Sequence, residues 1–375
     1  LCLMFDLRKI RAGYLITRYP LGNQGALLLA NYLKTQYQSH HLRTLSLRFA
    51  HIEEEGCKFL SGALFYAQSL VKLDLTGNSS MGLYAIALGQ TLKMTPQMVE
   101  LKISNINLGY DGFQVISEAL CFMPKLKVLE LKQNMISFAQ VAKIFPHVSK
   151  LHTLKLSDNN NENESIALLE ALPTLKFLRR LTITGLAITD ETLMRFQYLP
   201  NTLHYLTFKN SISVDQFIKN IAHLVHLETL NVEGCKFANI QVLRGIAHLP
   251  VTTLLLQNTG CAVTSGGDSI NQQYANALKL FTKLRIVDLT NCHLTLIDPF
   301  VMKLKHCTEL RILNLSHNTF NDSGLLEIHQ LLPFLRNLDV LNLVSTGVSN
   351  EFASAIRCKY TLHRVETNAN QWDKW

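Results

Sequence analysis

The stretch Leu310-Arg311-Ile312-Leu313-Asn314-Leu315-Ser316-His317-Asn318 is the clearest copy of a phrase that the chain repeats fourteen times. Leucines stand at offsets 0, 3 and 5 from the first residue of the phrase, and a small polar residue stands at offset 8. Successive copies begin 24 to 33 residues apart, with a mean of 27. Self-similarity at this period indicates a solenoid, in which each repeat is one unit of secondary structure packed on the next.

Each repeat is predicted to contain one strand and one helix. Apolar offsets 3 and 5 alternate with offsets 2, 4 and 6, which is the periodicity of a β-strand. After the strands, segments such as 25–34, 112–122, 165–172, 215–224 and 324–332 place apolar residues at i, i+3, i+4 and i+7, as amphipathic helices do. Parallel strands stack about 4.8 Å apart, whereas helix axes need about 8–10 Å, so the stack must bend. The predicted fold is an α/β solenoid, a horseshoe with a concave parallel β-sheet and convex helices.

The polar residue at offset 8 is predicted to satisfy backbone groups that the turn after each strand would otherwise bury unpaired. Asparagine fills this position at Asn78, Asn134, Asn159, Asn318 and Asn370, and smaller residues replace it at Cys235, Cys292, Thr259, Thr346 and Ser211. Ile106 departs from the pattern, so a neighbour such as Asn105 is expected to relay the hydrogen bonds there, or the turn is looser.

The phrase resembles the leucine-rich-repeat family, and the resemblance extends from about Arg11 to the end of the chain. The four N-terminal repeats are similar to the ribonuclease-inhibitor subclass, with stretches such as Leu21-Gly22-Asn23-Gln24-Gly25-Ala26-Leu27. Later repeats, such as that in residues 181–190, are similar to the cysteine-containing subclass. The resemblance implies a horseshoe, but it implies little about function because many unrelated proteins use this fold.

The unbroken repeat predicts a single domain over residues 1–375. Residues 1–41 are interpreted as an N-terminal cap with a weak first repeat, 42–361 as regular repeats, and 362–375 as the last repeat with a C-terminal cap. Three short repeats in 178–250 leave room only for short helices or 3₁₀ turns. The longest repeat carries its excess in Cys261–Gln273, which is either a solvated loop or a loop that touches a partner. The missing initiating methionine suggests a fragment.

Composition favours a cytoplasmic protein without a transmembrane segment. The eight cysteines are scattered rather than clustered into caps, which is typical of reduced thiols. No run of 18 apolar residues is present, so no transmembrane helix is expected. The net charge of +8 is spread along the chain, which favours an acidic partner only weakly. A monomer is expected.

The sequence predicts no enzyme, no cofactor and no metal. It contains no phosphate-binding G-x-x-x-x-G-K-[ST], no G-x-S-x-G, no H-E-x-x-H and no pair of C-x-x-C motifs. His223 and His226 could share a helix face, with His248 a repeat later, but zinc needs three or four ligands and no Cys or carboxylate completes the set.

The concave face carries the candidate binding residues, in two zones at offsets 2, 4 and 6. A basic zone contains Lys132, Lys155, Arg180, Tyr205 and Lys209, and an aliphatic zone contains Leu255, Ile286, Ile312 and Val340. Ile286, Ile312 and Val340 share offset 2 and are predicted to form a contiguous exposed stripe, which often marks a contact. Ordinary strand propensity and a solvated face are the alternative explanation of both zones.

Three hypotheses about function follow. The first is a non-enzymatic scaffold that binds a protein partner through the concave face and adjacent loops. It could act as a bacterial effector delivered into host cells, as the ligand-sensing region of a cytosolic nucleotide-binding receptor, or as a regulator of small GTPases. The second is a basic-face binder of nucleic acid or phosphoinositide, but only Tyr205 offers an aromatic ring for base stacking, so nucleic acid is not favoured. The third, an enzyme, would need a catalytic domain outside this chain.

Overall fold

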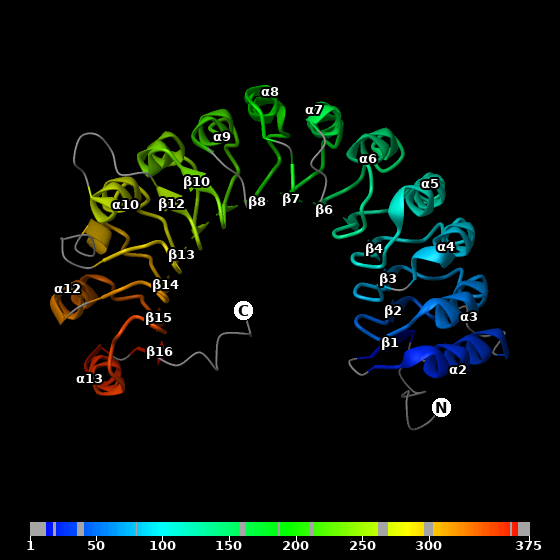
Figure 1. Cartoon of the computed structure of the whole chain (residues 1–375), viewed down its shortest axis with the longest axis horizontal. Coiled ribbons are helices and arrows are strands. Elements are labelled where there is room, and N and C mark those ends of the chain that lie inside the picture. The colour runs from blue at the N-terminus through cyan, green and yellow to red at the C-terminus, as the bar shows by residue number, and fades with distance from the viewer. Residues whose placement is uncertain are drawn as a thin grey trace. The chain divides into compact units, whose positions relative to one another are not determined.

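The structure of the chain is a computed structural model, which describes residues 13–17, 20–35, 41–79, 81–157, 162–186, 188–209, 214–261, 269–295, 303–320, 322–360 and 362–366. The chain divides into two compact units, Leu1–Thr202 and Leu203–Trp375. In each unit, parallel strands on one side alternate along the chain with helices on the other (Figure 1). We call these the strand side and the helix side.

The first unit contains seven parallel strands in chain order: β1 (Tyr14–Ile16), β2 (Thr44–Ser46), β3 (Lys72–Asp74), β4 (Glu100–Lys102), β5 (Val128–Glu130), β6 (Thr153–Leu156) and β7 (Arg180–Thr184). Its α-helices are α2 (Gly22–Thr35), α3 (Glu54–Leu64), α4 (Ala85–Leu92), α5 (Gly109–Leu120), α6 (Phe138–Ile144), α7 (Glu162–Ala171) and α8 (Asp190–Arg195). Short 3₁₀ turns adjoin three of them: η2 (Gly82–Tyr84), η3 (Leu172–Thr174) and η4 (Phe196–Tyr198).

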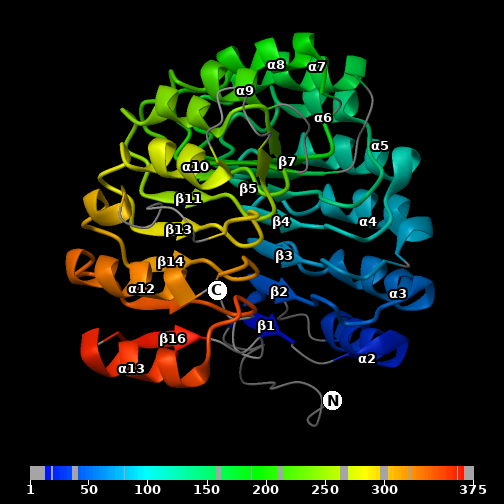
Figure 2. The same cartoon turned by 60° about the vertical axis from the view of Figure 1, so that its left-hand side comes forward.

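The described residues of the second unit form seven parallel strands: β8 (Tyr205–Lys209), β9 (Thr229–Asn231), β11 (Thr253–Leu255), β13 (Ile286–Asp288), β14 (Ile312–Asn314), β15 (Val340–Asn342) and β16 (Arg364–Glu366). A separate pair, β10 (Lys236–Phe237) and β12 (Gly260–Cys261), lies between the strand and helix sides. The helical elements are α9 (Asp215–Asn220), η5 (Ile240–Ile246), α10 (Ile270–Leu278), η6 (Leu304–His306), α12 (Asp322–Leu331), η7 (Leu332–Phe334) and α13 (Asn350–Tyr360). Figure 2 shows β11, β13, β14 and β16 of this unit stacked in that order.

The core is a ladder of leucines at offset 3. The strands pair without a shift of register, so that Leu45, Leu73, Leu101 and Leu129 lie opposite one another on β2 to β5. None of these four side chains is exposed to solvent. Each repeat therefore buries its leucines against the next repeat, as the sequence pattern predicts.

The chain turns at offset 7, where nearly every well-described repeat has a residue with positive φ. The positions are Phe49, Gly77, Asn105, Gln133, Gly185, Gly234, Asn258, Asn291, His317 and Ser345, with φ between 50° and 82°. This left-handed conformation costs a residue with a Cβ about 1 kcal/mol or more, so the surrounding packing must enforce it. The regular turn fixes the direction in which the chain enters the interior at offset 8.

Asparagines at offset 8 bridge neighbouring repeats, as predicted. Asn78 Nδ2 donates to the carbonyls of Leu47 and Leu75, and its Oδ1 accepts from the amide of Ile52. Asn318 has the same arrangement with residues 289, 315, 292 and 294. Asn159, Ser211 and Asn370 lie outside the described residues.

The expectation that the Asn105 side chain makes the hydrogen bonds of the turn at Ile106 is wrong. Asn105 is the left-handed residue of its turn, with φ of 52°. The amide of Ile106 instead donates to Oδ1 of Asn134 at 3.0 Å, and Asn134 Nδ2 donates to the carbonyl of Ile103 at 2.6 Å. The asparagine of the next repeat therefore serves the turn of Ile106, which needs no polar side chain of its own.

The predicted α/β solenoid is confirmed as parallel strands that alternate with helices, and the three short repeats carry α8, α9 and the 3₁₀ helix η5, as expected. The horseshoe and the single-domain organisation stay predictions. Most of the Cys261–Gln273 loop, residues 262–268, lies outside the described residues. Within the described ranges, no helix is long and apolar enough to cross a bilayer.

Candidate interaction surface

Lys155, one of the predicted basic residues, belongs to a row of alternating charges on the strand side of the first unit. Asp74, Lys102, Glu130 and Lys155 lie opposite one another on β3 to β6. Lys155 Nζ lies 2.9 Å from Glu130 Oε1, and Lys102 Nζ lies 3.8 Å from the same oxygen. Lys155, predicted as part of a positive zone, is therefore neutralised by the neighbouring strand.

Glu100 extends this network to the adjoining row. Its carboxylate lies 2.6 Å from Lys102 Nζ and 3.3 Å from Lys72 Nζ. Burial alone would raise the pKa of Glu100, but the hydrogen bonds and charges of Lys102 and Lys72 lower that pKa below its ordinary value. Burial would likewise lower the pKa of Lys102, and its bonds and charges with Glu100 and Glu130 raise it. Most of the charge here is balanced within the strand side.

The other residues of the predicted basic zone stand at offsets 2 and 6 of their repeats. Lys132 follows β5 at offset 6, and its amide donates to Ser104 Oγ at 3.1 Å. Arg180 begins β7 at offset 2, opposite Thr153. In the second unit, Lys209 pairs with Glu233, and the half-buried Tyr205 lies opposite Thr229. The structure thus places Lys155 and Lys209 each beside a carboxylate, that of Glu130 and that of Glu233.

The aliphatic residues of the second unit share one row, as their offset predicts. Ile286, Ile312 and Val340 lie opposite one another on β13, β14 and β15. Ile286 and Ile312 are half-buried. The prediction that Val340 is exposed is wrong, because only 6% of it is accessible. Val340 is short, and the longer Ile312 and Arg364 lie on either side of it.

Leu255 belongs to a neighbouring row with a different character. It is half-buried and lies opposite Asp288. The Asp288 carboxylate accepts hydrogen bonds from Gln257 Nε2 and Asn314 Nδ2, both at 3.0 Å, and from Thr290 Oγ1 at 2.6 Å. Burial raises the pKa of Asp288, and these hydrogen bonds offset part of that increase. A polar network therefore borders the aliphatic row on one side.

Arginines border the aliphatic row on its other side, at the amino ends of the strands. A cavity of about 1060 Å³ opens there in the second unit. It is lined by the first residues of five strands, by the residues directly before those strands and by one residue of α13. These are Thr252, Thr253, Arg285, Ile286, Arg311, Ile312, Asp339, Val340, Arg357, His363 and Arg364. We call it the arginine–isoleucine groove.

Sequence reasoning missed Arg285, Arg311 and Arg357 as site residues. It considered only offsets 2, 4 and 6, whereas Arg285 and Arg311 stand at offset 1, one residue before their strands. The recurrence of arginine at offset 1 in two successive repeats was the available signal. Arg357 comes from α13, so no strand pattern could have indicated it.

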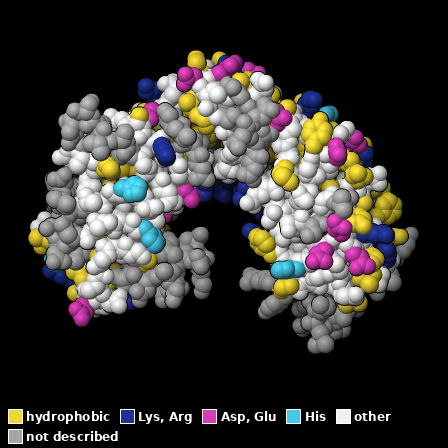
Figure 3. Space-filling model, viewed as in Figure 1, with side chains coloured by type: hydrophobic (Ala, Val, Ile, Leu, Met, Phe, Trp, Pro, Cys, Tyr) yellow, Lys and Arg dark blue, Asp and Glu magenta, His cyan; other side chains and the backbone are white. Residues whose placement is uncertain are grey.

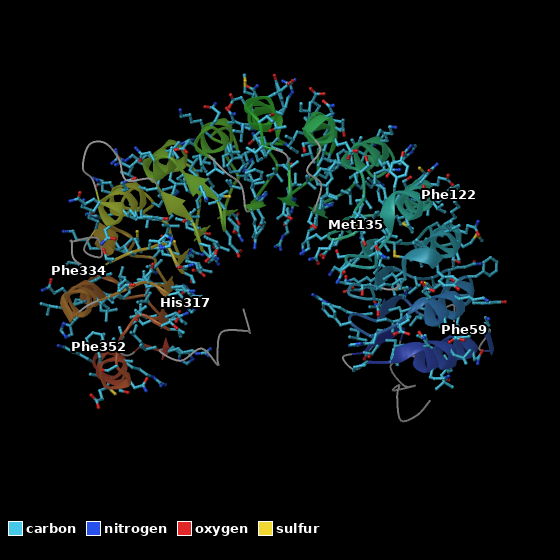
Figure 4. The ribbon with its side chains drawn as sticks, in the orientation of Figure 1. Phe59, Phe122, Met135, His317, Phe334 and Phe352 are labelled. Atoms are coloured by element: carbon cyan, nitrogen blue, oxygen red, sulfur yellow. The ribbon has the colours of Figure 1, made fainter. Side chains whose placement is uncertain are left out.

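A second surface is apolar and lies on the helix side of the first unit. Tyr66, Met94 and Phe122 recur every 28 residues and are 41%, 39% and 54% exposed. Figure 3 shows hydrophobic side chains spread over the helices of this unit. In Figure 4, Phe122 lies at the outer, helix side, while Met135 lies nearer the strand side. Figure 3 also shows charged side chains interspersed with the hydrophobic ones.

The described residues contain no group of three or more His, Cys, Asp and Glu side chains that could hold a metal ion. His223 Nδ1 and His248 Nε2 instead lie near the carbonyls of Asn220 and Ala222, and the ring of His226 stacks on that of His204.

The repeated strand–turn–helix unit, the leucine ladder and the offset-8 asparagines define the class of this molecule: it is a leucine-rich-repeat protein. The family model described as "Leucine Rich repeat" matches residues 38–61 and 306–328.

Comparisons with known proteins agree. The chain is 27% identical over 258 residues to the NACHT, LRR and PYD domains-containing protein 14 of Mus musculus, covering 62% of this chain and 25% of that protein. It is 26% identical over 303 residues to the ribonuclease inhibitor of Sus scrofa, covering 76% of this chain and 65% of the inhibitor. The match thus spans 25% of the length of the mouse protein and 65% of the length of the pig inhibitor. The crystal structure of a TLR13-ssRNA13 complex matches with a TM-score of 0.53 and 18% identity, over 88% of this chain and 47% of that one, which shows a shared fold.

Proposed function

We propose that this protein is a non-enzymatic scaffold that binds a protein partner through the strand side of its second unit. The observation that carries the proposal is the arginine–isoleucine groove, where half-buried Ile286 and Ile312 lie beside charged side chains in one cavity. Apolar contacts surrounded by polar and charged groups are the usual composition of a protein-binding surface. The leucine-rich-repeat fold, which many proteins use for binding, supports the same conclusion.

The alternative is a basic-face binder of nucleic acid or phosphoinositide. The ion pairs of Lys155 and Lys209 with carboxylates weaken this alternative. A cation already paired with a carboxylate releases fewer counterions from a polyanion, so it contributes less to such binding. The similarity to a TLR13-ssRNA13 complex extends only to the fold and does not restore this alternative.

The mouse relative, whose name records a repeat region beside other domains, supports one of the predicted contexts. We therefore favour the ligand-binding repeat region of a larger cytoplasmic receptor over an effector delivered into host cells. Six free cysteines among the described residues are in keeping with a reducing compartment.

An affinity capture from cytosolic lysate tests the scaffold proposal. The intact chain is compared with Ile286→Thr/Ile312→Thr, which keeps β-branched side chains on both strands but removes the apolar contact. Val128→Thr makes a similar change at the same offset in the first unit, where Val128 is also half-buried, and serves as the matched control.

A protein identified by mass spectrometry should be retained by the intact chain and by Val128→Thr, and lost with Ile286→Thr/Ile312→Thr. Part of its retention should persist at moderate salt, because the apolar contact with Ile286 and Ile312 is weakly screened, whereas contacts between exposed charges weaken. Equal retention by all three chains would contradict the proposed surface. Recovery of nucleic acid or lipid alone, lost with salt, would favour the alternative.

A further inference from the structure

The arginine–isoleucine groove has two chemically different edges that run in parallel. One edge is the row of residues directly before the strands, Thr252, Arg285, Arg311, Asp339 and His363. The other is the first residue of each strand, Thr253, Ile286, Ile312, Val340 and Arg364, in register across five neighbouring strands. A ligand that lies along the groove therefore meets charge on one side and aliphatic surface on the other.

Backbone hydrogen bonds hold the first edge in place. The carbonyl of Arg285 accepts from the amides of both Arg311, at 2.8 Å, and Ile312, at 3.0 Å. The carbonyl of Arg311 accepts in the same way from Asp339 and Val340, at 2.8 and 2.9 Å. Because these bonds join β13, β14 and β15 at the residues directly before the strands, the Cα atoms of Arg285 and Arg311 are fixed side by side before a ligand arrives, which lowers the entropic cost of binding.

The charge of the groove is positive. Among the described residues that line it, four are arginines, Arg285, Arg311, Arg357 and Arg364, and one, Asp339, carries a carboxylate. Outside the groove, Glu309 lies 3.3 Å from Arg285 Nε, and both side chains are about half exposed. An exposed ion pair of this kind is worth less than about 1 kcal/mol, so it leaves Arg285 able to engage a competing carboxylate. This differs from the first unit, where acidic and basic residues alternate along one row.

The dimensions suit a short extended peptide. Five strands about 4.8 Å apart give a groove of about 19 Å, which an extended chain covers with about six residues at about 3.3 Å each. Successive side chains of an extended chain point to opposite sides. Alternating acidic and aliphatic residues would therefore place carboxylates over Arg285 and Arg311 and apolar groups over Ile286 and Ile312.

We propose that the groove binds an extended acidic segment of the protein partner, in which glutamate or aspartate alternates with aliphatic residues. This inference rests on the proposed scaffold function and names the chemistry of what the scaffold binds. Arginine presents a planar fork that matches a carboxylate in two parallel hydrogen bonds, so paired arginines select acidic side chains.

Single-stranded RNA fits the groove less well. Among the residues that the structure describes, no aromatic ring other than the imidazole of His363 lines the groove, so these residues give bases almost nothing on which to stack. The carboxylate of Asp339 repels phosphates, and the two isoleucines offer no hydrogen bonds to bases.

Fluorescence anisotropy with defined peptides tests the proposal. The probe is a labelled octapeptide of alternating glutamate and leucine, and the reference probe has glutamine in place of every glutamate. The protein is the full chain, its Arg285→Gln/Arg311→Gln variant, and Arg43→Gln/Arg179→Gln. The last variant removes the same charge from exposed offset-1 positions of the first unit, so it controls for net charge and folding.

The acidic peptide should bind the full chain and the control variant alike. Its Kd should rise by about tenfold or more for Arg285→Gln/Arg311→Gln, since each lost charge-assisted bond is worth about a factor of ten. The glutamine peptide should bind at least about tenfold more weakly than the acidic one. No binding of the acidic peptide, or an equal loss in both double variants, would overturn the proposal, as would stronger binding of an oligouridylate of the same length.

The two proposals fail separately. If the partner captured from lysate is lost with Ile286→Thr/Ile312→Thr but retained by Arg285→Gln/Arg311→Gln, the scaffold stands and the acidic segment is wrong. If neither double variant loses the partner, the groove is not the binding surface and both proposals fall.

Discussion

Oδ1 of Asn318 accepts a hydrogen bond from the backbone amide of Cys292 at 3.0 Å, across 26 residues of sequence. The same oxygen accepts from Leu294, and Nδ2 donates to the carbonyls of Leu289 and Leu315. One side chain that is 2% exposed thus joins the turns of two successive repeats. Its loss would leave several backbone groups buried without partners.

Asn318→Ala is therefore expected to destabilise the second unit by about 2–4 kcal/mol, since each buried unsatisfied group costs about 1–3 kcal/mol. Hydrogen exchange at the amides of Cys292 and Leu294 should accelerate by a corresponding factor. Asn337→Ala, which removes one exposed bond to the carbonyl of Thr308, is the control and should change little. Unchanged exchange in Asn318→Ala would mean that the turns hold without the asparagine.

Truncation of two neighbouring residues of β14 should destabilise the protein to different degrees. Leu313 is 1% exposed, whereas Ile312 is half-buried on the strand side. Leu313→Ala should cost about 2–5 kcal/mol because it opens a cavity in the leucine ladder, and Leu313→Asp should unfold the surrounding repeats because it buries an unpaired charge. Ile312→Ala should cost clearly less. Urea unfolding followed by circular dichroism measures the difference, and equal losses would mean that the strand phase is misassigned.

Gly77 is expected to resist substitution. Its φ is 82°, and a Cβ there would lie 2.1 Å from the ring of Phe49 in the preceding turn. Gly77→Ala should lower the melting temperature, with a cost of about 1–3 kcal/mol from strain and displacement of the ring. Gly62→Ala on α3, where a Cβ meets nothing within 4 Å, should raise stability by about 0.5–1 kcal/mol. The two variants form a matched pair, and destabilisation of both to the same degree would contradict this account.

Glu100 makes the stability of the first unit depend on pH. Its pKa in the folded state lies below the ordinary value of 4.5, because Lys102 and Lys72 stabilise the carboxylate more than burial penalises it. The contribution is thus present above the unfolded pKa and is lost as pH falls through the folded pKa. Glu100→Gln should cost about 0.5–1.5 kcal/mol at about pH 7 and close to nothing at about pH 3. Urea unfolding at both pH values measures this, and a cost that persists in acid would refute the ion-pair explanation.

Thiol reactivity should separate the cysteines. Burial raises the pKa of Cys57 and Cys307 to about 12 and that of Cys292 to about 11, whereas Cys121 and Cys358 are exposed. Because the thiolate is the reactive form, iodoacetamide should modify Cys121 and Cys358 in the native protein and leave the buried thiols of Cys57, Cys292 and Cys307 unmodified. Peptide mass spectrometry gives the extent at each site, with the urea-unfolded chain as the fully reactive control. Rapid native labelling of Cys292 would show that its repeat opens readily.

The sequence alone determined the repeat, the strand phase and the buried positions. The spacing of leucines such as Leu313 and of asparagines such as Asn318 is sufficient because a solenoid contacts only its nearest neighbours, so local periodicity decides what is buried. The same spacing placed Ile286, Ile312 and Val340 in one row, as the strand register has them.

Only the tertiary structure decided which side chains on the strand side are available to a partner. The sequence predicts Lys155 as part of a basic zone, but Glu130 lies opposite it on the neighbouring strand and pairs with it. Val340 reads as exposed, but longer neighbours on both strands leave it 6% accessible. Arg357 reaches the groove from a helix. Availability depends on the lengths and charges of side chains on adjacent strands and helices, which periodicity within one repeat does not encode.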